Sequence, residues 1–572
     1  MNPDMLTAQS LLNCLVREVS LPEEQVGETG GHLIVRLARS DRLLQLGTRR
    51  RSAGTGPRLT GEAAIKCGET WQPVGWAELS PLIAAELTLA TGTVNDEFAA
   101  QVRGSHASIT EILRARTDEG TGQDQGIAAD PRVARYLSSE QALVAGHRFH
   151  PAPKARSGAP GDWLPFAPEA GARFPLRFLA VRGEEFDAGG DTSALDRLDP
   201  PPAPAGYHVL PAHPWQLRLL ARRPWLRRAL RDRVLIDLGD GPRAVVPTSS
   251  VRTVYDPVAD AFCKFSLNVR ITNCVRKNAW YELAGAVALT ALLGPVTADL
   301  AARFPGAAVL GEPGYLTVTL PEVEAAEGLS VIFREGLGPG LAPGVTPLLA
   351  AALTEPPRGA LPGPAGRQPP GAVDSGLFDG RDPDWLLAWW EAYVRQVAPP
   401  VLHALFGHGI VFEPHLQNVL IGVDGDGLPV QALFRDLEGV KLVTPRHDQA
   451  LAALKPEVAR ALGYDTERGW HRVAYCLFVN HLAEIAAAIA DRHPRAAERF
   501  EAALWDRARE VLTGFAGDHG WPPQLLAVLA GVPLPAKANL RLRWARGADR
   551  EAAYVSVRNP LGEPITSRQT AW

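Results

Sequence analysis

The chain has 572 residues, of which 46% are hydrophobic and 21% charged, and its formal net charge is −4. This composition is typical of a globular protein with two to four domains, and the slight acidity argues against a general nucleic-acid or membrane-surface role. Any anion site must therefore be local. The five cysteines are scattered without a Cys-x-x-Cys pair, which predicts reduced thiols and neither a disulfide scaffold nor a cysteine-based zinc or iron–sulfur site.

The N-terminal part combines helices with a small sheet. We expect a helix over residues 5–19, an antiparallel meander over 32–74 and helical structure over 80–116. The first residues lack a basic segment followed by an apolar run, so we expect no signal peptide. The longest apolar stretch, residues 283–293, is too short to span a bilayer. The sequence therefore predicts a cytoplasmic protein with neither a membrane nor a nucleic-acid partner.

The rest of the chain alternates strands and helices before becoming mostly helical. A Gly- and Pro-rich segment over 336–375 is interpreted as a loop and a domain boundary. The other expected elements are a short helix at 140–145, strands at 172–182 and 206–211, a basic helix from 211 to about 231, strands at 232–238, 243–255 and 262–273, a helix at 278–293, helices at 384–397 and on to 406, and a strand pair at 538–545 and 553–557.

Two consecutive strands in the middle of the chain carry cationic and hydroxyl side chains on one face. A turn at Asp256-Pro257 should pair them antiparallel, with residue numbers summing to about 517, so that Thr253 lies beside Lys264. No carboxylate interrupts 244–255 or 262–276, although a solvated face normally mixes both signs. The pattern favours a triphosphate or carboxylate site over a bland polar face. The face comprises Ser250, Arg252, Lys264, Ser266, Asn268 and Arg270, with Arg276 just beyond.

A second polar group is expected at the open end of a hairpin. A strand over 410–412 leads to a polar segment and then to arms 418–423 and 428–434, joined by Asp-Gly-Asp-Gly. Residue 418 should lie opposite 433 or 434, which brings two polar segments together. We interpret this end as a site, with an ordinary solvated hairpin as the alternative. Its side chains are Glu413, His415, Gln417, Asn418, Arg435, Asp436 and Glu438.

A third polar segment, residues 146–158, holds two histidines and two cations between prolines. His147 and His150 could suggest a metal, but no third ligand is spaced nearby and the neighbours are cations. A rigid loop that presents His147, His150, Lys154 and Arg156 to a carboxylate-rich substrate is more natural, with plain loop structure as the alternative. His213, which precedes Pro-Trp-Gln, is interpreted as the structural start of a helix, with a site wall as the alternative.

No standard phosphate-binding loop is present in the sequence, neither GxxxxGK[ST] nor a GxGxxG that joins a strand to a helix. His415 and Asn418, with Asp436 18 residues further on, faintly match the Asn and metal-binding Asp of kinase-like phosphotransferases. A small-molecule kinase is therefore the alternative, although no Gly-rich lid is visible. The third alternative is a degenerate carrier of an anionic ligand.

Six motifs together resemble the IucA/IucC family, the nucleotide-dependent, NRPS-independent siderophore (NIS) synthetases. They are GHxxHPxPKxRxG (146–158), HPWQ (213–216), SxRT (250–253), KxSLNVRITNxVR (264–276), ExHxQNxL (413–420) and RDxEG (435–439). The resemblance implies an α+β, cupped-hand architecture of thumb, fingers and palm, with antiparallel sheets and a largely helical C-terminal part. We place these parts at 1–135, 136–335 and 336–572.

The resemblance also implies the reaction. Such enzymes use ATP and Mg²⁺ to adenylate citrate, a citrate derivative or a succinyl-type acid, and then join the acyl group to an amine, hydroxylamine or alcohol, releasing AMP and pyrophosphate. The expected partners are these small molecules, and a homodimer is compatible with the resemblance. The C-terminal part resembles a region labelled ferric-reductase-like, but it carries no cysteine cluster, so iron reduction is not expected.

Site roles follow from the matching positions. The resemblance implies ATP binding by Ser250, Arg252, Thr253, Lys264, Arg276, His415, Gln417 and Asn418, with Arg252, Lys264, Arg276 and His415 central to catalysis. It implies metal binding by Glu413, Asn418 and Asp436, and acid binding by His147, His150, Lys154, Arg156 and Arg276. The chain departs from the family pattern at Pro414 and Phe265, and neither change removes a polar group.

Overall fold

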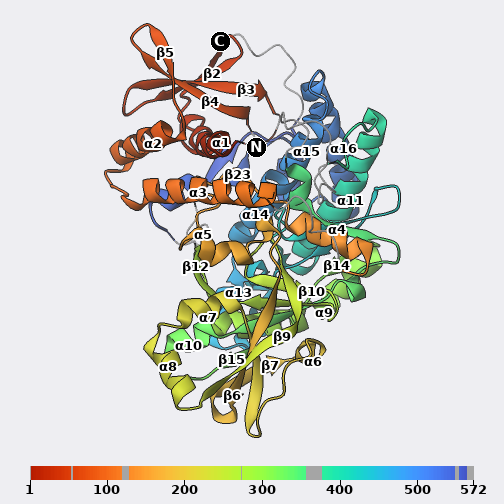
Figure 1. Ribbon diagram of the computed structural model, residues 1–572. Helices are drawn as coiled ribbons and strands as arrows, with labels where there is room; N and C mark the ends of the chain where they lie inside the picture. Colours follow the sequence, from red (N-terminus) through yellow and green to blue (C-terminus); the bar gives the residue numbers. More distant parts are fainter. Residues whose placement is uncertain are drawn as a thin grey trace.

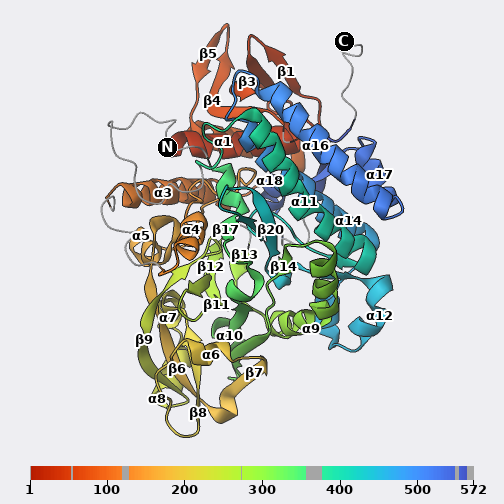
Figure 2. The same ribbon diagram turned by 90° about the vertical axis from the view of Figure 1, so that its right-hand side faces the viewer.

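The computed structural model describes residues 2–52, 54, 56–118, 128–271, 274–355, 376–547 and 553–562. Three regions are visible in Figure 1: an N-terminal sheet with helices at the top, a large sheet at the bottom, and a mainly helical C-terminal region along one side. A view turned by 90° shows the same arrangement (Figure 2). The fold is α+β, as the sequence predicted.

The N-terminal region confirms the predicted meander. Its five strands pair antiparallel in chain order, and alternate side chains such as Val35 and Leu44 pack on Leu11 of the first helix. The predicted helical stretch is two helices separated by Gly92, which adopts a left-handed conformation. The elements are α1 (Pro3–Leu15), continued by the π-helical turn Val16–Ser20, β1 (Val26–Thr29), β2 (His32–Leu37), β3 (Arg42–Arg50), β4 (Arg58–Cys67), β5 (Thr70–Pro73), α2 (Trp76–Thr91) and α3 (Glu97–Asp118).

The helix expected at 140–145 lies earlier in the chain, as α4 (Pro131–Glu140). Asp130 caps it by accepting from the backbone N–H of Arg132, and Pro131 occupies the first helical position. This Asp-Pro pair is a standard helix start that the hydrophobic pattern did not reveal. The helix therefore ends at Glu140, where the chain turns toward the polar segment at 146–158.

The middle region is an eight-stranded sheet in the order β7-β15-β16-β11-β10-β9-β6-β8. Thr253 pairs with Lys264, which confirms the predicted register. The predicted basic helix is two helices, because Pro224 disfavours helical backbone at the residue before it. The elements are α5 (Pro160–Trp163), β6 (Phe174–Arg182), β7 (Phe186–Gly190), α6 (Ala194–Arg197), β8 (Tyr207–Ala212), α7 (Pro214–Leu220), α8 (Pro224–Arg231), β9 (Leu235–Pro247), β10 (Thr253–Asp256), β11 (Ala261–Phe265), β15 (Gly314–Val318), α10 (Val323–Gly328) and β16 (Val331–Glu335).

Two predicted strands of this region are interrupted. The strand expected over 243–255 breaks at 248–252, so Ser250 and Arg252 lie in a tight turn. The strand expected over 262–273 leaves the sheet after Phe265, whose partner Arg252 is already in that turn. The chain continues as β12 (Leu267–Ile271), which pairs with β13 (Cys274–Arg276) in a separate ribbon. Sequence alternation alone could not show this, because it continues through the break.

The hairpin of the C-terminal region is present and belongs to a four-stranded sheet, β14-β20-β19-β17. Val419 pairs with Phe434, so residue 418 lies opposite 435, one position beyond the prediction. Strand β17 occupies part of the predicted 336–375 loop, and residues 356–375 lie outside the described residues. The elements are α9 (Trp280–Arg303), β14 (Ala307–Val309), β17 (Thr346–Leu349), β18 (Ile410–Val411), β19 (Val419–Val423), β20 (Pro429–Phe434), β21 (Lys441–Val443), α12 (Thr444–Ala452), α13 (Pro456–Leu462) and β22 (Gly463–Tyr464).

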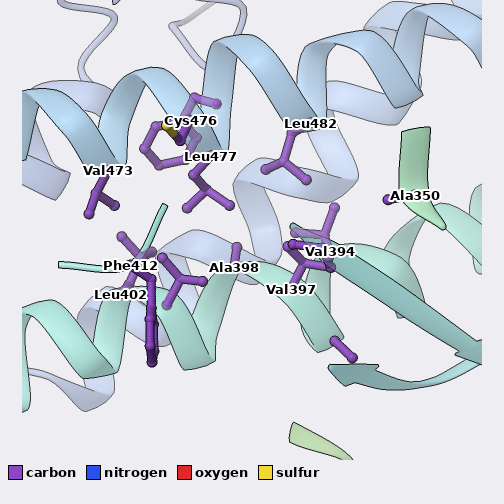
Figure 3. Close-up of a cluster of buried hydrophobic side chains, with 14 of the residues drawn as sticks. Ala350, Val394, Val397, Ala398, Leu402, Phe412, Val473, Cys476, Leu477 and Leu482 are labelled. Carbon is purple, nitrogen blue, oxygen red and sulfur yellow. The ribbon is translucent and has the colours of Figure 1, made fainter. Parts of the chain in front are cut away.

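A helical core supports this sheet. The two helices expected before the hairpin are one, α11 (Pro383–His408), which contains Pro399 and Pro400. Figure 3 shows Val394, Val397, Ala398 and Leu402 of α11 facing side chains of the helical stretch 466–490, including Leu477. The apolar window of this stretch is 94% buried, which identifies a core helix. The elements are α14 (Thr466–Ala474), the π-helical turn Tyr475–Leu482, α15 (Ala483–Ala490), α16 (Ala497–Asp518) and α17 (Pro523–Leu529).

The last predicted strand pair is half wrong. β24 (Tyr554–Val557) pairs with β23 (Leu534–Lys537), whereas the residues after β23 form α18 (Asn539–Trp544). Glu18 accepts hydrogen bonds from the backbone N–H groups of Leu540 and Arg541 at the start of α18. A carboxylate at a helix N-terminus is stabilising. This carboxylate comes from the other end of the chain, so the local pattern did not show it.

Candidate active site

A cavity of about 1210 Å³ opens between the eight-stranded sheet, the hairpin end and the loop at 146–156. All fourteen residues that the resemblance marked as site residues line it. Ser266 is instead fully buried against Ser330, and Asn268 hydrogen-bonds Gln216, so these two do not line the cavity. The side chain of Arg270 lies outside the described residues. The cavity lining has thirteen Lys and Arg residues against eight Asp and Glu, although the whole chain is acidic.

Three cations meet three carboxylates at the floor of the cavity. Lys264 Nζ lies 2.5 Å from Asp436, 3.0 Å from Glu438 and 3.7 Å from Glu312. Segments 244–255 and 262–276 contain no acids, but they do not form one continuous sheet face, and carboxylates reach Lys264 and Arg252 from other segments. The cluster consists of Lys264, Arg252, Arg334, Asp436, Glu438 and Glu312, and we call it the six-charge cluster.

The two arginines complete the six-charge cluster. Arg252, on the turn after β9, donates to Asn278 Oδ1 and Glu438 Oε2, both at 2.5 Å. Arg334, on β16, donates to Glu312 at 2.6 Å and to Asp436 at 3.3 Å. Burial alone would raise the pKa of Glu438, but the charges of Lys264 and Arg252 lower it to about 2. The neighbouring cations also lower the pKa of Asp436, so Glu438 and Asp436 are both ionised and hold Lys264 and Arg252 in fixed positions.

The hairpin end is fixed by a second buried ion pair. Arg435 binds Glu140 at the end of α4 and donates to the hydroxyl of Tyr136 at 3.0 Å. Glu140 also accepts from the backbone N–H of Ser249 at 2.9 Å. The guanidinium of Arg435 further donates to the carbonyl of Gln417. This network connects α4, the turn at 248–252 and the hairpin. Arg435 therefore holds these three segments of the cavity lining in fixed relative positions.

The polar segment before the hairpin contributes an acid, an amide and a histidine. Glu413 pairs with Arg472 of α14 at 2.5 Å, and the side-chain amide of Asn418 donates to the carbonyl of Glu413 at 3.2 Å. The amide of Gln417 reaches the hydroxyl of Ser249 at 3.3 Å. The carbonyl of Pro414 lies 2.7 Å from His481 Nδ1, which anchors the segment at the position where the chain departs from the family pattern.

Three cavity histidines share one arrangement. The Nδ1 atoms of His147, His150 and His415 each accept from the backbone N–H two residues further on, at 3.1 to 3.3 Å. A neutral ring with Nδ1 as acceptor carries its proton on Nε2. Burial lowers the pKa of His415 below its usual value and that of His147 to about 3, so both rings are neutral at pH 7. His415 is therefore an uncharged N–H donor, whereas Nε2 of His147 lies 2.8 Å from the side-chain amide nitrogen of Asn480, so both ring nitrogens of His147 are engaged, which disfavours a metal there.

The two cations of the 146–156 loop share a buried carboxylate. Lys154 and Arg156 both bind Glu169, which is 2% exposed, and Arg156 does so through both carboxylate oxygens at 2.7 and 2.8 Å. Burial alone would raise the pKa of Glu169, but the charges of Arg156 and Lys154 lower it to about 2. The loop is thus held rigid at the cavity wall with one cation in excess.

Two residues of the site have unusual backbone conformations. Val251 has φ of 69° between Ser250 and Arg252, and Asp436 has φ of 76°. Positive φ is strained for a β-branched residue and costs of the order of 1–3 kcal/mol. The strain is retained where the surrounding structure over-determines the backbone, and here it directs Arg252 and Asp436 into the six-charge cluster.

Comparison with known proteins identifies the fold. Residues 135–355 match the model of the IucA / IucC family, and residues 387–552 match the "Ferric iron reductase FhuF-like transporter" model. The rhizobactin siderophore biosynthesis protein RhbC of Rhizobium meliloti is 29% identical over 98% of both chains. The L-2,3-diaminopropanoate–citrate ligase of Staphylococcus aureus is 30% identical over 65% of this chain and 64% of its own.

A solved structure agrees over the whole chain. ATP-bound aerobactin synthetase IucA of Klebsiella pneumoniae superposes with a TM-score of 0.81 and 25% identity, covering 98% of this chain and 99% of that one. The chain belongs to the IucA/IucC family. It is an ATP-dependent ligase of siderophore biosynthesis, and the kinase alternative is not favoured. The region that matches the FhuF-like model contains a single cysteine, Cys476, which is buried.

Some residues in and around the cavity were not found from the sequence. Arg334 and its partner Glu312 lie on segments with no polar pattern, and Arg472 and Lys537 come from α14 and β23 of the C-terminal region. The one available signal was Arg334, a lone cation in the apolar strand Val-Ile-Phe-Arg-Glu. Glu282 is a further cavity residue, at the start of α9, where burial and the charge of Glu438 raise its pKa to about 7.

Proposed function

We propose that this ligase adenylates a carboxyl group of citrate, a citrate derivative or a succinyl-type acid and joins it to an amine, hydroxylamine or alcohol. The name of the staphylococcal relative, a citrate ligase that uses an amino acid, supports this choice of substrates. The carboxylate attacks the α-phosphorus of ATP and pyrophosphate leaves. The nucleophile then attacks the acyl carbon, loses a proton and displaces AMP, which gives an amide or an ester.

The excess of cations in the cavity carries the proposal. Arg252, Lys264 and Arg276 would neutralise the triphosphate and the charge that develops at the reacting phosphorus, together with Ser250, Thr253, Gln417 and Asn418. Because carboxylates already hold Lys264 and Arg252, these cations need no reorganisation when the reaction occurs. The chemistry requires no covalent nucleophile from the protein.

The donor set of the hairpin fits Mg²⁺. Glu413, Asn418 and Asp436 offer the oxygen ligands that Mg²⁺ prefers, and they lie on one wall of the cavity. When bound, the ion would neutralise phosphate charge. Asp436 and Glu413 also keep their basic partners Lys264 and Arg472 in place.

The acid would occupy the end of the cavity formed by the 146–156 loop. His147 and His150 line this end, His415 supplies a neutral N–H donor, and Lys154 and Arg156 supply one net positive charge beyond Glu169. Hydrogen bonds to an ionised carboxylate contribute roughly 1.5–3 kcal/mol each. A polycarboxylate can form more of these hydrogen bonds than a monocarboxylate, so it should bind this end of the cavity more tightly. The three-part division at residues 135 and 335, a cytoplasmic location and a homodimer remain predictions.

Product analysis tests the proposal. The purified chain is incubated with ATP, Mg²⁺ and a panel of citrate, succinyl compounds, diamines and hydroxylamines, and products are identified by mass spectrometry. We expect acid-dependent release of pyrophosphate and AMP, and an amide or ester only when a nucleophile is present. Release of ADP would support the kinase alternative. The absence of any nucleotide turnover with the whole panel would support the non-catalytic carrier.

A further inference from the structure

A cluster of two histidines and an aspartate lies outside the cavity, between α9 and α11. His403 Nε2 and His408 Nε2 lie 2.7 and 2.8 Å from the same oxygen of Asp299. Nitrogen and oxygen atoms of these three residues all lie within 4.8 Å of one another, as ligands of one metal ion would. Among the described residues, this is the single group of three or more His, Cys, Asp or Glu residues with that geometry.

A chain of hydrogen bonds fixes which nitrogen of His403 carries the proton. His519 Nδ1 lies 2.9 Å from the carbonyl of Phe515, so it donates, and its Nε2 is an acceptor in the neutral ring. His403 Nδ1 lies 2.9 Å from that Nε2 and donates to it when His519 is neutral. The Nε2 of a neutral His403 then carries a lone pair.

This lone pair points at a carboxylate oxygen. Two acceptors 2.7 Å apart repel each other unless a cation or a proton lies between them. The side chain of His403 is 8% exposed, so burying it as a cation without compensation is costly. A metal ion between His403 Nε2 and the Asp299 oxygen therefore accounts for their short distance better than a protonated imidazole does.

We propose that Asp299, His403 and His408 bind a divalent transition-metal ion of the Zn²⁺ class. Two imidazoles and one carboxylate are typical ligands of Zn²⁺, and water would fill the fourth position, since Asp299 and His408 are 29% and 30% exposed. The outer contacts also match those of metal sites. His403 donates through its other nitrogen to His519, and the second oxygen of Asp299 accepts from Arg303 at 2.8 Å.

The position of the cluster suggests a structural role. Asp299 lies on α9 and the two histidines at the end of α11, and α11 packs side by side with α16, which leads to His519 (Figure 2). The first half of α9 contributes Tyr281, Glu282 and Leu289 to the active-site cavity. A metal ion would thus fix the far end of a helix whose near end forms the active-site wall. The scattered cysteines gave no signal of this site, because its ligands are histidine and aspartate.

Metal analysis of the untagged chain tests the proposal. Zn²⁺ is titrated against a chromophoric chelator, and Co²⁺ substitution is followed by its visible absorption. We expect one tight Zn²⁺ per chain, and at least tenfold weaker binding in Asp299→Asn and in His408→Gln. The matched control is His106→Gln, which removes a histidine that lies 2.7 Å from Asp4 but belongs to no such group of three. It should bind Zn²⁺ like the wild type.

A second measurement separates metal loss from misfolding. Zn²⁺ should raise the Tm of the wild type and of His106→Gln, but not of Asp299→Asn, because a ligand that binds only the folded state stabilises it. Each variant is checked for a cooperative unfolding transition without metal. Wild-type Zn²⁺ affinity in folded Asp299→Asn would overturn the proposal. Absence of tight Zn²⁺ and Co²⁺ binding by the wild type would also overturn it, and would identify the contact as a His403–Asp299 ion pair.

Discussion

Lys264 and Asp436 are 172 positions apart in the chain, yet Lys264 Nζ lies 2.5 Å from Asp436 Oδ1. The pair joins the strand β11 of the middle sheet to the end of the C-terminal hairpin. Burial alone would raise the pKa of Asp436, but the charges of Lys264 and Arg334 hold it well below its usual value. The contact is thus both a link between two regions of the chain and a part of the proposed ATP site.

A double-mutant cycle separates these two roles. Lys264→Met and Asp436→Asn should each destabilise the protein by roughly 3–5 kcal/mol, because each leaves a buried charge without its partner. The double variant should recover part of this loss, since Arg252–Glu438 and Arg334–Glu312 remain matched. Urea unfolding of the four proteins measures the coupling.

Activity should not recover with stability. ATP–pyrophosphate exchange should fall by about 100-fold or more in Lys264→Met and in the double variant, because a cation that stabilises transferred charge is missing in both. A double variant with wild-type exchange would show that Lys264 acts only structurally.

Val251 allows a test of backbone strain. At most positions Gly is less stable than Ala by roughly 0.5–1 kcal/mol, because it loses more conformational freedom on folding. Val251 has φ of 69°, where only Gly is relaxed. We therefore expect Val251→Gly to be at least as stable as Val251→Ala, although it is smaller. Val254→Ala and Val254→Gly, at a buried position on β10, provide the control, where Ala should be more stable. If the Ala variant were more stable than the Gly variant at both positions, the result would contradict backbone strain at Val251.

Gly439 should not tolerate a side chain. A Cβ atom added there would lie 3.0 Å from Cβ of Glu413 and closer still to its carboxylate, so Glu413 must move away from Arg472. We expect Gly439→Ala to lower ligase turnover at least tenfold and to destabilise the protein by roughly 1–3 kcal/mol. Gly425→Ala, in the turn of the β19–β20 hairpin, has no atom within 4 Å of its added Cβ and should behave like the wild type. Equal turnover of the two variants would argue against a role for the Glu413 position.

Sequence patterns correctly predicted the strand pairing and the hairpin around the cavity. Alternation and the turn at Asp256 gave the pairing of Thr253 with Lys264, and the Asp-Gly-Asp-Gly turn gave the hairpin to within one residue. The family motifs gave fourteen residues that share one cavity. The two strand pairings join residues fewer than 20 positions apart, so the local sequence contains them, whereas the fourteen cavity residues were found through motifs spread over residues 146–439.

The features that the sequence did not predict depend on contacts between residues far apart in the chain. Glu312 and Arg334 meet the predicted cations only after the sheet has formed, and Glu18 starts α18 from the opposite end of the chain. Alternation also continued past Phe265, where the chain in fact leaves the sheet because its partner is in a turn. These errors arise because tertiary contacts override a local period.

Glu169 predicts how stability depends on pH. Its pKa in the folded chain is about 2, whereas an unfolded Glu titrates at about 4.3. A depressed carboxyl pKa stabilises the folded state above the unfolded pKa, and this contribution is lost as the pH falls from about 4.3 toward 2. The shift corresponds to roughly 3 kcal/mol. Glu169→Gln, which leaves Lys154 and Arg156 without their shared carboxylate, should lack this contribution at every pH.

The difference between wild type and Glu169→Gln is the quantity to measure. Free energies of unfolding from urea titrations should differ by roughly 3–5 kcal/mol at pH 7. The difference should shrink steadily below pH 4.5, because other carboxylates titrate equally in both proteins and cancel. Glu69→Gln changes an exposed Glu and should stay within about 0.5 kcal/mol of the wild type throughout. A Glu169→Gln difference that is constant between pH 7 and pH 3 would show that Glu169 is not held ionised by the two cations.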